Sequence, residues 1–197
     1  MTAPSGTGKT TVARQVFQRF ENLKFSVSHT TRPARAGEAE GEDYYFVGEA
    51  VFDGMVVEDA FAEWAHVHKR RYGTSKAEVE RILELGQDIL LDVDVQGARS
   101  LRRVYPRATS IFLLPPSFAE LAQRLKGRAT DSSDQVATRL KTAQEEVLDA
   151  RDFQHVIVNE NVDQAALAFG AILENRPSPA GLRHDHVDVL LDELRPS

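Results

Sequence analysis

The sequence predicts an α/β protein in which a mostly parallel central sheet lies between helices, in three layers. Short apolar segments that suit buried strands alternate with helical patterns along most of the 197 residues. A glycine-rich turn, "APSGTGKTT" at residues 3–11, leads directly into the first helical pattern. The most apolar strand, "DILLDVDV" at residues 88–95, carries carboxylates near its end. We therefore expect polar chemistry at the carboxyl ends of parallel strands.

Composition and charge narrow the class of protein. A length of 197 residues suits one domain, or one domain with an inserted lid. The absence of cysteine excludes disulfides and thiolate metal sites. No apolar run approaches the roughly 20 residues that cross a bilayer, and we expect no signal peptide and no membrane partner. A net charge of −6 argues against nucleic-acid binding, so positive charge that handles anions must be placed locally.

Four segments in the first half of the chain carry a clear pattern. A helical pattern follows the glycine-rich turn, and its apolar face is formed by Val12, Val16, Phe17 and Phe20. Residues 25–31, "FSVSHTT", alternate like a half-buried strand. Residues 32–46 form a polar loop that ends in an aromatic strand. An amphipathic helix over 76–87, with a glycine near its end, precedes the strand at 88–95.

The second half of the chain continues the alternation. Two further apolar strands are expected over 110–116 and 155–159. The helices expected there cover 117–126, 133–151 and 162–174. The tail from residue 175 begins with a proline-rich break and carries a short helix near 185–194.

The glycine-rich turn has the composition of a phosphate-binding loop. It matches G-x-x-x-x-G-K-[ST] except that Ala3 stands in the first position. Gly6 and Gly8 allow a tight turn whose backbone N–H groups point into one concavity, and the following helix adds its positive end. Lys9 supplies a charge toward the transferable phosphates, and Thr10 offers a hydroxyl to Mg²⁺. The alternative is an ordinary glycine-rich turn before a helix.

The carboxylates of "LLDVDVQG" form a second candidate element. Asp92 and Asp94 lie two residues apart, so on a strand they face the same side. Two like charges on one side are costly unless a cation or hydrogen-bond donors await them, which favours a Mg²⁺ site beside the phosphate loop. A strand end that reaches solvent is the alternative.

Basic side chains are concentrated in two loops of this acidic chain. Arg32 and Arg35 flank Pro33 and precede Tyr44 and Tyr45, a set that suits a small phosphate dianion. A solvated charged loop explains the same residues. Further along, "RLKGRATDSSDQVATRL" resembles a lid that closes over transferring phosphates, or an exposed helix–loop–helix. Its arginines are Arg124, Arg128 and Arg139.

Histidines do not indicate a metal site. His66 and His68 share a side only if they lie on a strand, and no carboxylate completes a ligand set with them.

Six segments, taken in order, resemble the nucleoside monophosphate kinases, and the guanylate kinase family in particular. They are "APSGTGKTT", "SVSHTTRPARAGEAEGEDYYF", "FAEWAHVH…YGTS", "LLDVDVQG", "RLKGRATDS" and "VIVN". The resemblance implies a P-loop fold over residues 1–174, with a GMP-binding subdomain at about 28–80, an arginine-bearing lid at about 124–140 and a tail at 175–197. It implies transfer of the γ-phosphoryl group of ATP to GMP with Mg²⁺, by a cytoplasmic monomer or homodimer.

The resemblance also implies roles for individual residues. The ATP-binding residues would be Ser5, Gly6, Thr7, Gly8, Lys9, Thr10, Thr11 and Asn159. The GMP-binding residues would be Ser28, Arg32, Arg35, Glu38, Tyr44, Glu63, Tyr72, Thr74 and Asp92. The catalytic residues would be Lys9, Arg32, Arg124, Arg128 and Arg139, and the metal would be held by Thr10 and Asp94.

Guanine recognition has a chemical rationale on this reading. The Glu63 carboxylate can accept from N1–H and the exocyclic amine of guanine, and adenine lacks both donors on that edge. Thr74 or Ser28 could donate to O6, and Glu38 would orient its neighbours. The GMP phosphate is itself the nucleophile, so alignment and charge stabilisation suffice without a general base.

The chain departs from the family pattern in two places. "HKRRYGTS" stands where members usually read "HGNYYGTS" or close to it, so Lys69, Arg70 and Arg71 change the loop before Tyr72. These three residues either alter the affinity for GMP or only line the rim of its site. Met1 and Thr2 alone precede the loop where the family has a central strand, which suggests a truncated start. The alternatives to a guanylate kinase are therefore a phosphopeptide-binding module, a kinase with another acceptor, and a weak or inactive relative.

Overall fold

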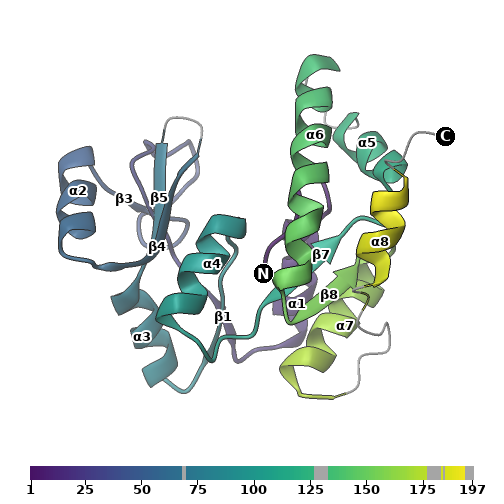
Figure 1. The fold of residues 1–197 in the computed structure, drawn as a ribbon. Helices are drawn as coiled ribbons and strands as arrows, with labels where there is room; N and C mark the ends of the chain where they lie inside the picture. The colour runs from purple at the N-terminus through teal and green to yellow at the C-terminus, as the bar shows by residue number, and fades with distance from the viewer. Residues whose placement is uncertain (68–69, 127–132, 177–182, 184, 194–197) are drawn as a thin grey trace. The chain divides into compact units, whose positions relative to one another are not determined.

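The computed structural model describes residues 1–67, 70–126, 133–176, 183 and 185–193. The chain divides into two compact units (Figure 1). The first comprises Met1–Phe20 and Thr109–Ser197, and the second comprises Glu21–Ala108. No helix within these described ranges is both long and apolar enough to cross a membrane.

The first unit contains a parallel strand pair flanked by helices. Strand β7 (Ile111–Leu114) runs parallel to β8 (His155–Val158), with Ile111 opposite His155. Thr2 extends this pairing, since its N–H donates to the Ile111 carbonyl at 2.9 Å and its carbonyl accepts from Leu113 N at 2.8 Å. The helices of the unit are α1 (Lys9–Arg19), α5 (Phe118–Lys126), α6 (Ser133–Asp149), the 3₁₀ turn η1 (Ala150–Asp152), α7 (Val162–Leu173) and α8 (Asp185–Asp192).

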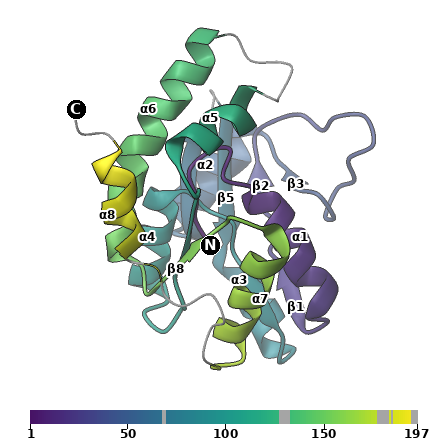
Figure 2. The ribbon, with the colours of Figure 1, turned by 90° about the vertical axis from the view of Figure 1, so that its right-hand side faces the viewer.

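The core of the first unit lies around β7 and between α1 and α7. All four residues of β7 are buried, as a strand covered on both faces requires. Figure 2 shows α1 and α7 side by side, and Val12 and Val16 of α1 are fully buried. Gly170 of α7 leaves room for the Phe20 ring, which a Cβ would meet at 2.6 Å. Phe20 itself lies just beyond α1, so the expected helical face ends one residue early.

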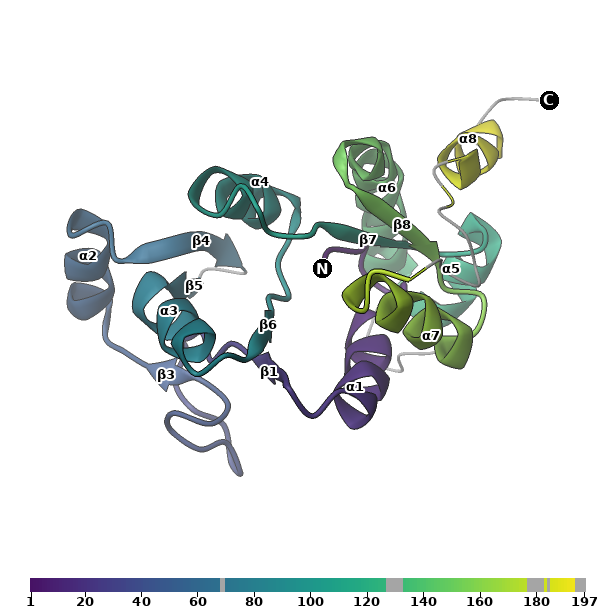
Figure 3. The ribbon, with the colours of Figure 1, turned by 90° about the horizontal axis from the view of Figure 1, so that it is seen from below.

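Residues 21–67 and 70–108, the described part of the second unit, form two sheets and three helices. Strand β1 (Leu23–Phe25) pairs in parallel with β6 (Asp88–Leu90). A four-stranded sheet has the order β3-β2-β5-β4. Its strands are β2 (His29–Thr30), β3 (Tyr45–Phe46), β4 (Phe61–Val67) and β5 (Arg70–Ser75). The helices are α2 (Glu49–Val57), α3 (Lys76–Glu84) and α4 (Val95–Val104), and Figure 3 shows α4 beside β4.

Two strand predictions in the second unit were wrong in extent. Residues 25–31 do not form one strand, because β1 ends at Phe25 and pairs with β6, whereas β2 begins at His29 and pairs with β3 and β5. The strand expected over 88–95 ends at Leu90. Asp94 is instead the N-cap of α4, where its carboxylate accepts from Gly97 N at 2.7 Å. Helix α2, the antiparallel hairpin of β4 and β5, and α4 were not among the predicted elements.

Candidate functional site

The glycine-rich turn adopts the backbone geometry that its sequence predicts. Gly6 and Gly8 have φ angles of +91° and +98°, in the left-handed region that favours glycine. Thr7 N donates to the Pro4 carbonyl at 3.1 Å, which closes the turn. Helix α1 begins at Lys9, directly after Gly8, so its positive N-terminal end belongs to the loop. This is the local structure that holds phosphate oxygens.

Close packing adds to the preference for glycine that the positive φ angles create at both positions. A Cβ at Gly8 would lie 2.7 Å from Asn159 Nδ2, and a Cβ at Gly6 would lie 2.8 Å from Leu125 Cδ2. Both distances are shorter than ordinary carbon contacts. The loop is therefore seated against the end of β8 and against α5.

Two of the predicted site residues brace this loop. Asn159 is 2% exposed, and its Nδ2 donates to the Thr7 carbonyl at 2.7 Å. Arg124 donates to the same carbonyl and to the Asn159 carbonyl, both at 3.2 Å, and its Nε pairs with Glu120 at 3.1 Å. Asn159 and Arg124 thus support the backbone of the loop at Thr7, through hydrogen bonds that the sequence did not predict.

The other predicted ATP-side residues lie along the loop and on α6. Lys9 is half-buried, whereas Ser5, Thr10 and Thr11 are exposed at the loop and the first turn of α1. Arg139 is half-buried on α6. Arg128 lies outside the described residues.

In the second unit, Glu38 holds Arg32 in a bidentate ion pair. Both terminal nitrogens of Arg32 donate to the Glu38 carboxylate at 2.8 Å, and Arg35 N donates to Glu38 Oε2 at 2.8 Å. These bonds hold the pKa of Glu38 below its usual range and raise the pKa of Arg32. The Arg32 guanidinium is therefore oriented by a residue of its own loop.

Aromatic rings surround this guanidinium. The Arg32 Cζ lies 5.3 Å from the centre of the Tyr44 ring and 5.7 Å from that of Phe46. Tyr44 meets Tyr72 edge to face, with ring centres 5.8 Å apart. Burial raises the pKa of Tyr44, so its phenol stays protonated and can donate to an anion. Arg35 is exposed next to this group.

Glu63 and Thr74 form a second polar contact, across strands β4 and β5. The Thr74 hydroxyl donates to Glu63 Oε1 at 2.8 Å, and Thr74 N donates to the same oxygen at 3.2 Å. Burial raises the pKa of Glu63, and the Thr74 hydroxyl opposes that rise. The Thr74 hydroxyl, which was expected as a possible donor to guanine O6, donates to Glu63 instead. Ser28 and Asp92 are half-buried in the same unit.

The prediction that Asp92 and Asp94 form a carboxylate pair on one side of a strand was wrong. Asp92 and Asp94 lie beyond the end of β6, so strand alternation does not place them on one side. One Asp94 oxygen is used to cap α4. This hydrogen bond to Gly97 N caps the first turn of α4, which begins at Val95.

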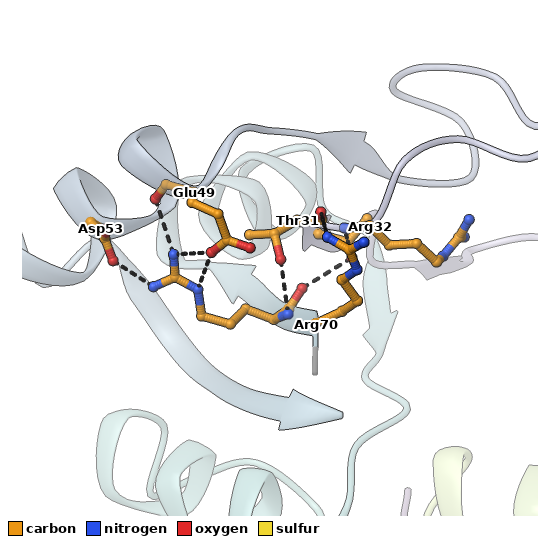
Figure 4. Close-up of polar contacts among 7 residues, drawn as sticks. Thr31, Arg32, Glu49, Asp53 and Arg70 are labelled. Carbon is orange, nitrogen blue, oxygen red and sulfur yellow. Dashed lines mark hydrogen bonds and ion pairs between the residues drawn. The ribbon is translucent and has the colours of Figure 1, made fainter. Parts of the chain in front are cut away.

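Arg71, one of the departures from the family pattern, contacts a helix rather than the Arg32 group (Figure 4). It bonds to Glu49 and Asp53 of α2, which no sequence argument had paired with it. Glu49 and Asp53 are four residues apart, so they face one way on a helix, and this spacing was the available signal. Arg70 donates to the Thr31 carbonyl at 3.4 Å. Lys69 lies outside the described residues.

Comparisons with known proteins identify the family of this chain. The guanylate kinase family model matches residues 1–176. This chain belongs to the guanylate kinase family. It is 48% identical over 173 residues to the guanylate kinase of Syntrophotalea carbinolica, covering 88% of this chain and 82% of that protein. It is 46% identical over 194 residues to the guanylate kinase of Coxiella burnetii, covering 98% and 94%.

The fold comparison points to the same family. The crystal structure of guanylate kinase from Anaplasma phagocytophilum matches with a TM-score of 0.69 and 32% identity, over 98% of this chain and 91% of that one. The family predicted from six ordered segments and the predicted α/β fold class are both confirmed. The site residues of the guanylate kinase reading, described above, lie partly in each of the two units.

Proposed function

We propose that this protein transfers the γ-phosphoryl group of ATP to GMP, giving ADP and GDP. One observation carries the proposal: a chain of the guanylate kinase family keeps a phosphate loop with Lys9 and Thr10, and also an oriented arginine among phenols. Catalysis by alignment and charge stabilisation requires both parts. The cytoplasmic location implied by the family remains part of this proposal.

The loop of the first unit would hold the donor. Backbone N–H groups of the turn and the start of α1 would bind the phosphates, and Lys9 would place its charge on the transferable group. Asn159 and Arg124 would keep the loop in this shape during turnover. The arginines of α5, α6 and the intervening segment, Arg124, Arg139 and Arg128, are proposed to stabilise charge as transfer proceeds.

Each unit offers one oxygen of the kind that Mg²⁺ prefers. In the first unit, the exposed Thr10 hydroxyl at the start of α1 is a hard oxygen ligand, and in the second unit Asp94 has a second oxygen besides the one that caps α4. The assignment of both to one ion is what the family resemblance implies. The ion, when bound with ATP, would neutralise phosphate charge.

The second unit would hold the acceptor. Arg32, Arg35, Tyr44 and Tyr72 would bind the GMP phosphate, with Glu38 fixing the plane of the Arg32 guanidinium. That phosphate is the nucleophile, so no side chain needs to remove a proton.

Guanine would be recognised by the carboxylate of Glu63. The ionised carboxylate accepts from N1–H and the exocyclic amine, while Thr74 keeps Oε1 oriented. Ser28 and Asp92 are proposed to complete the base site, with Ser28 as the donor to O6, because the Thr74 hydroxyl is already committed. AMP would leave the carboxylate without donors, so it should be a poor acceptor.

The test is an acceptor screen. The purified chain is mixed with ATP, Mg²⁺ and either GMP or AMP, and ADP formation is followed, with Lys9→Ala as the control. ADP production with GMP only, lost in Lys9→Ala, is the expected result. Turnover with another acceptor but not GMP would reassign the substrate. Silence with every acceptor would contradict the kinase function and leave a binding role.

A further inference from the structure

Arg71 makes several charged contacts with helix α2, and the contacts described for its guanidinium are with α2 and not with the proposed acceptor residues. Its Nε donates to Glu49 Oε2 at 2.9 Å, and its Nη1 donates to Asp53 Oδ1 at 2.6 Å. Its Nη2 donates to the Glu49 carbonyl at 3.0 Å and also to the Glu49 carboxylate. The side chain is only 11% exposed, so the guanidinium makes these contacts largely shielded from solvent.

The α2 side of this contact is built for a guanidinium. Glu49 and Asp53 lie one helical turn apart, which places both carboxylates on the side that faces β5. Between them, the fully buried Phe52 ring lies 4.6 Å from the Arg71 Cζ. A planar fork can bond both acids while its face covers the ring, whereas a lysine ammonium could not do all three.

The backbone of Arg71 is bonded to the segment that leads into Arg32. Its carbonyl accepts from Thr31 N and from the Thr30 hydroxyl, both at 3.0 Å. The Thr30 hydroxyl in turn accepts from Arg32 N at 3.1 Å. One residue therefore connects helix α2, through its side chain, to the backbone amide of Arg32, through its carbonyl.

Both backbone groups of Arg71 are bonded to Thr31, the residue before Arg32 (Figure 4). Arg71 N donates to Thr31 Oγ1 at 3.0 Å, and the Arg71 carbonyl accepts from Thr31 N. The side chain of the same residue is held by Glu49 and Asp53 of α2. Movement of α2 would therefore be transmitted through Arg71 to Thr31.

Strand alternation explains why Arg71 acts indirectly. Successive side chains of β5 point to opposite faces, so Tyr72 packs on Tyr44 beside Arg32 while Arg71 faces α2. Arg71 is therefore placed to position the phosphate-binding residues without touching the phosphate.

We propose that Arg71 is a positioning residue for the acceptor phosphate: by fastening α2 to Thr31, it sets where the Arg32 guanidinium stands. The inference rests on the proposed function, because it names the part of that site which a change at position 71 would loosen. A misplaced binding group weakens the binding of the substrate that it contacts and leaves the binding of the other substrate unchanged.

The test compares the KM values of Arg71→Met with those of the wild type. Methionine keeps apolar cover over Phe52 but removes every bond to the two acids. KM for GMP is expected to rise about tenfold, while KM for ATP stays within about twofold. Arg71→Lys, which can reach one acid at a time, should recover part of the loss. Lys76→Met is the matched control, because it breaks an ion pair to Asp59 (2.6 Å) and leaves the Thr31 network intact.

A change in KM for GMP without a change in KM for ATP distinguishes a positioning role from simple destabilisation of the fold. A variant that only lost folded molecules would show lower kcat and unchanged KM for both substrates. If Arg71→Met does not fold, Glu49→Gln with Asp53→Asn provides the same test, since these acids are 58% and 66% exposed and tolerate neutral side chains. A KM for GMP within about twofold of wild type in the folded variant would overturn the inference. Wild-type protein that fails to phosphorylate GMP would instead overturn the proposed function, and the inference with it.

Discussion

Replacing Thr74 by valine would test how Glu63, the carboxylate proposed to recognise guanine, is held. Thr74 is 2% exposed, and its hydroxyl and N–H both donate to Glu63 Oε1, at 2.8 Å and 3.2 Å. Valine has the same branched shape but no hydroxyl, so the change removes one of these two donors. A hydrogen bond to a charged group contributes about 1.5 to 3 kcal/mol. For a protein of this size, that loss corresponds to a melting temperature about 3 to 12 °C lower.

The loss of stability in Thr74→Val should be smaller at low pH than at high pH. Burial raises the pKa of Glu63 above its ordinary value, and the Thr74 hydroxyl partly opposes this by favouring the charged form. Its loss raises the pKa of Glu63 further. The stability deficit of Thr74→Val is therefore full where the carboxylate is ionised in both proteins, and it shrinks as the pH falls through the raised pKa.

Thermal unfolding and steady-state kinetics would check both consequences. Melting curves of wild type, Thr74→Val and Thr74→Ser are compared between about pH 5 and pH 8. The acidic limb of kcat/KM for GMP should move to higher pH in Thr74→Val, because only the ionised Glu63 accepts from guanine. Thr74→Ser keeps the hydroxyl and should resemble wild type. A stability deficit that does not vary with pH, together with an unmoved acidic limb, would refute the reasoning.

Three further changes have defined outcomes. Gly8→Ala should abolish tight ATP binding, because a left-handed backbone costs a non-glycine residue about 1 to 2 kcal/mol and the new Cβ would lie 2.7 Å from Asn159 Nδ2. Calorimetric titration with ATP measures this loss, and the control variant Gly54→Ala, whose new Cβ would have no atom within 4 Å, should bind ATP normally. Glu38→Gln should raise KM for GMP and leave KM for ATP unchanged in initial-rate assays, since an amide cannot accept from both Arg32 nitrogens; an equal rise in both constants would contradict this. Removing α8 should cost about 3 to 6 kcal/mol in urea unfolding, because two of its apolar side chains are fully buried, and an unchanged midpoint would show that α8 is dispensable.

The elements predicted well from the sequence are those whose cause is local. The loop at Gly6 and Gly8 requires positive φ angles, and the next residues start a helix, so neighbouring residues determine it. The apolar runs of β7 and β8 were long enough to be read as buried strands. Family membership followed from the order of such local segments.

The failures occurred where a distant partner or a competing hydrogen bond decides the outcome. Residues 25–31 have one alternating pattern, but their two ends pair with different strands, which no pattern within the segment can reveal. Asp94 alternates with Asp92 as a strand would, yet a bond to Gly97 N, three residues on, makes it a helix cap.

The sequence by itself therefore determined the family to which this chain belongs, and it predicted the residues that are proposed here to bind phosphate and the carboxylate that is proposed to recognise guanine. Only the tertiary structure decided how those groups are held. Asn159 and Arg124 brace the loop from 152 and 117 residues away, and Arg71 bonds an acid 22 residues earlier. The physical reason is that reactive groups are specified by residue type and short spacing, whereas the hydrogen bonds that orient them join segments brought together only by folding.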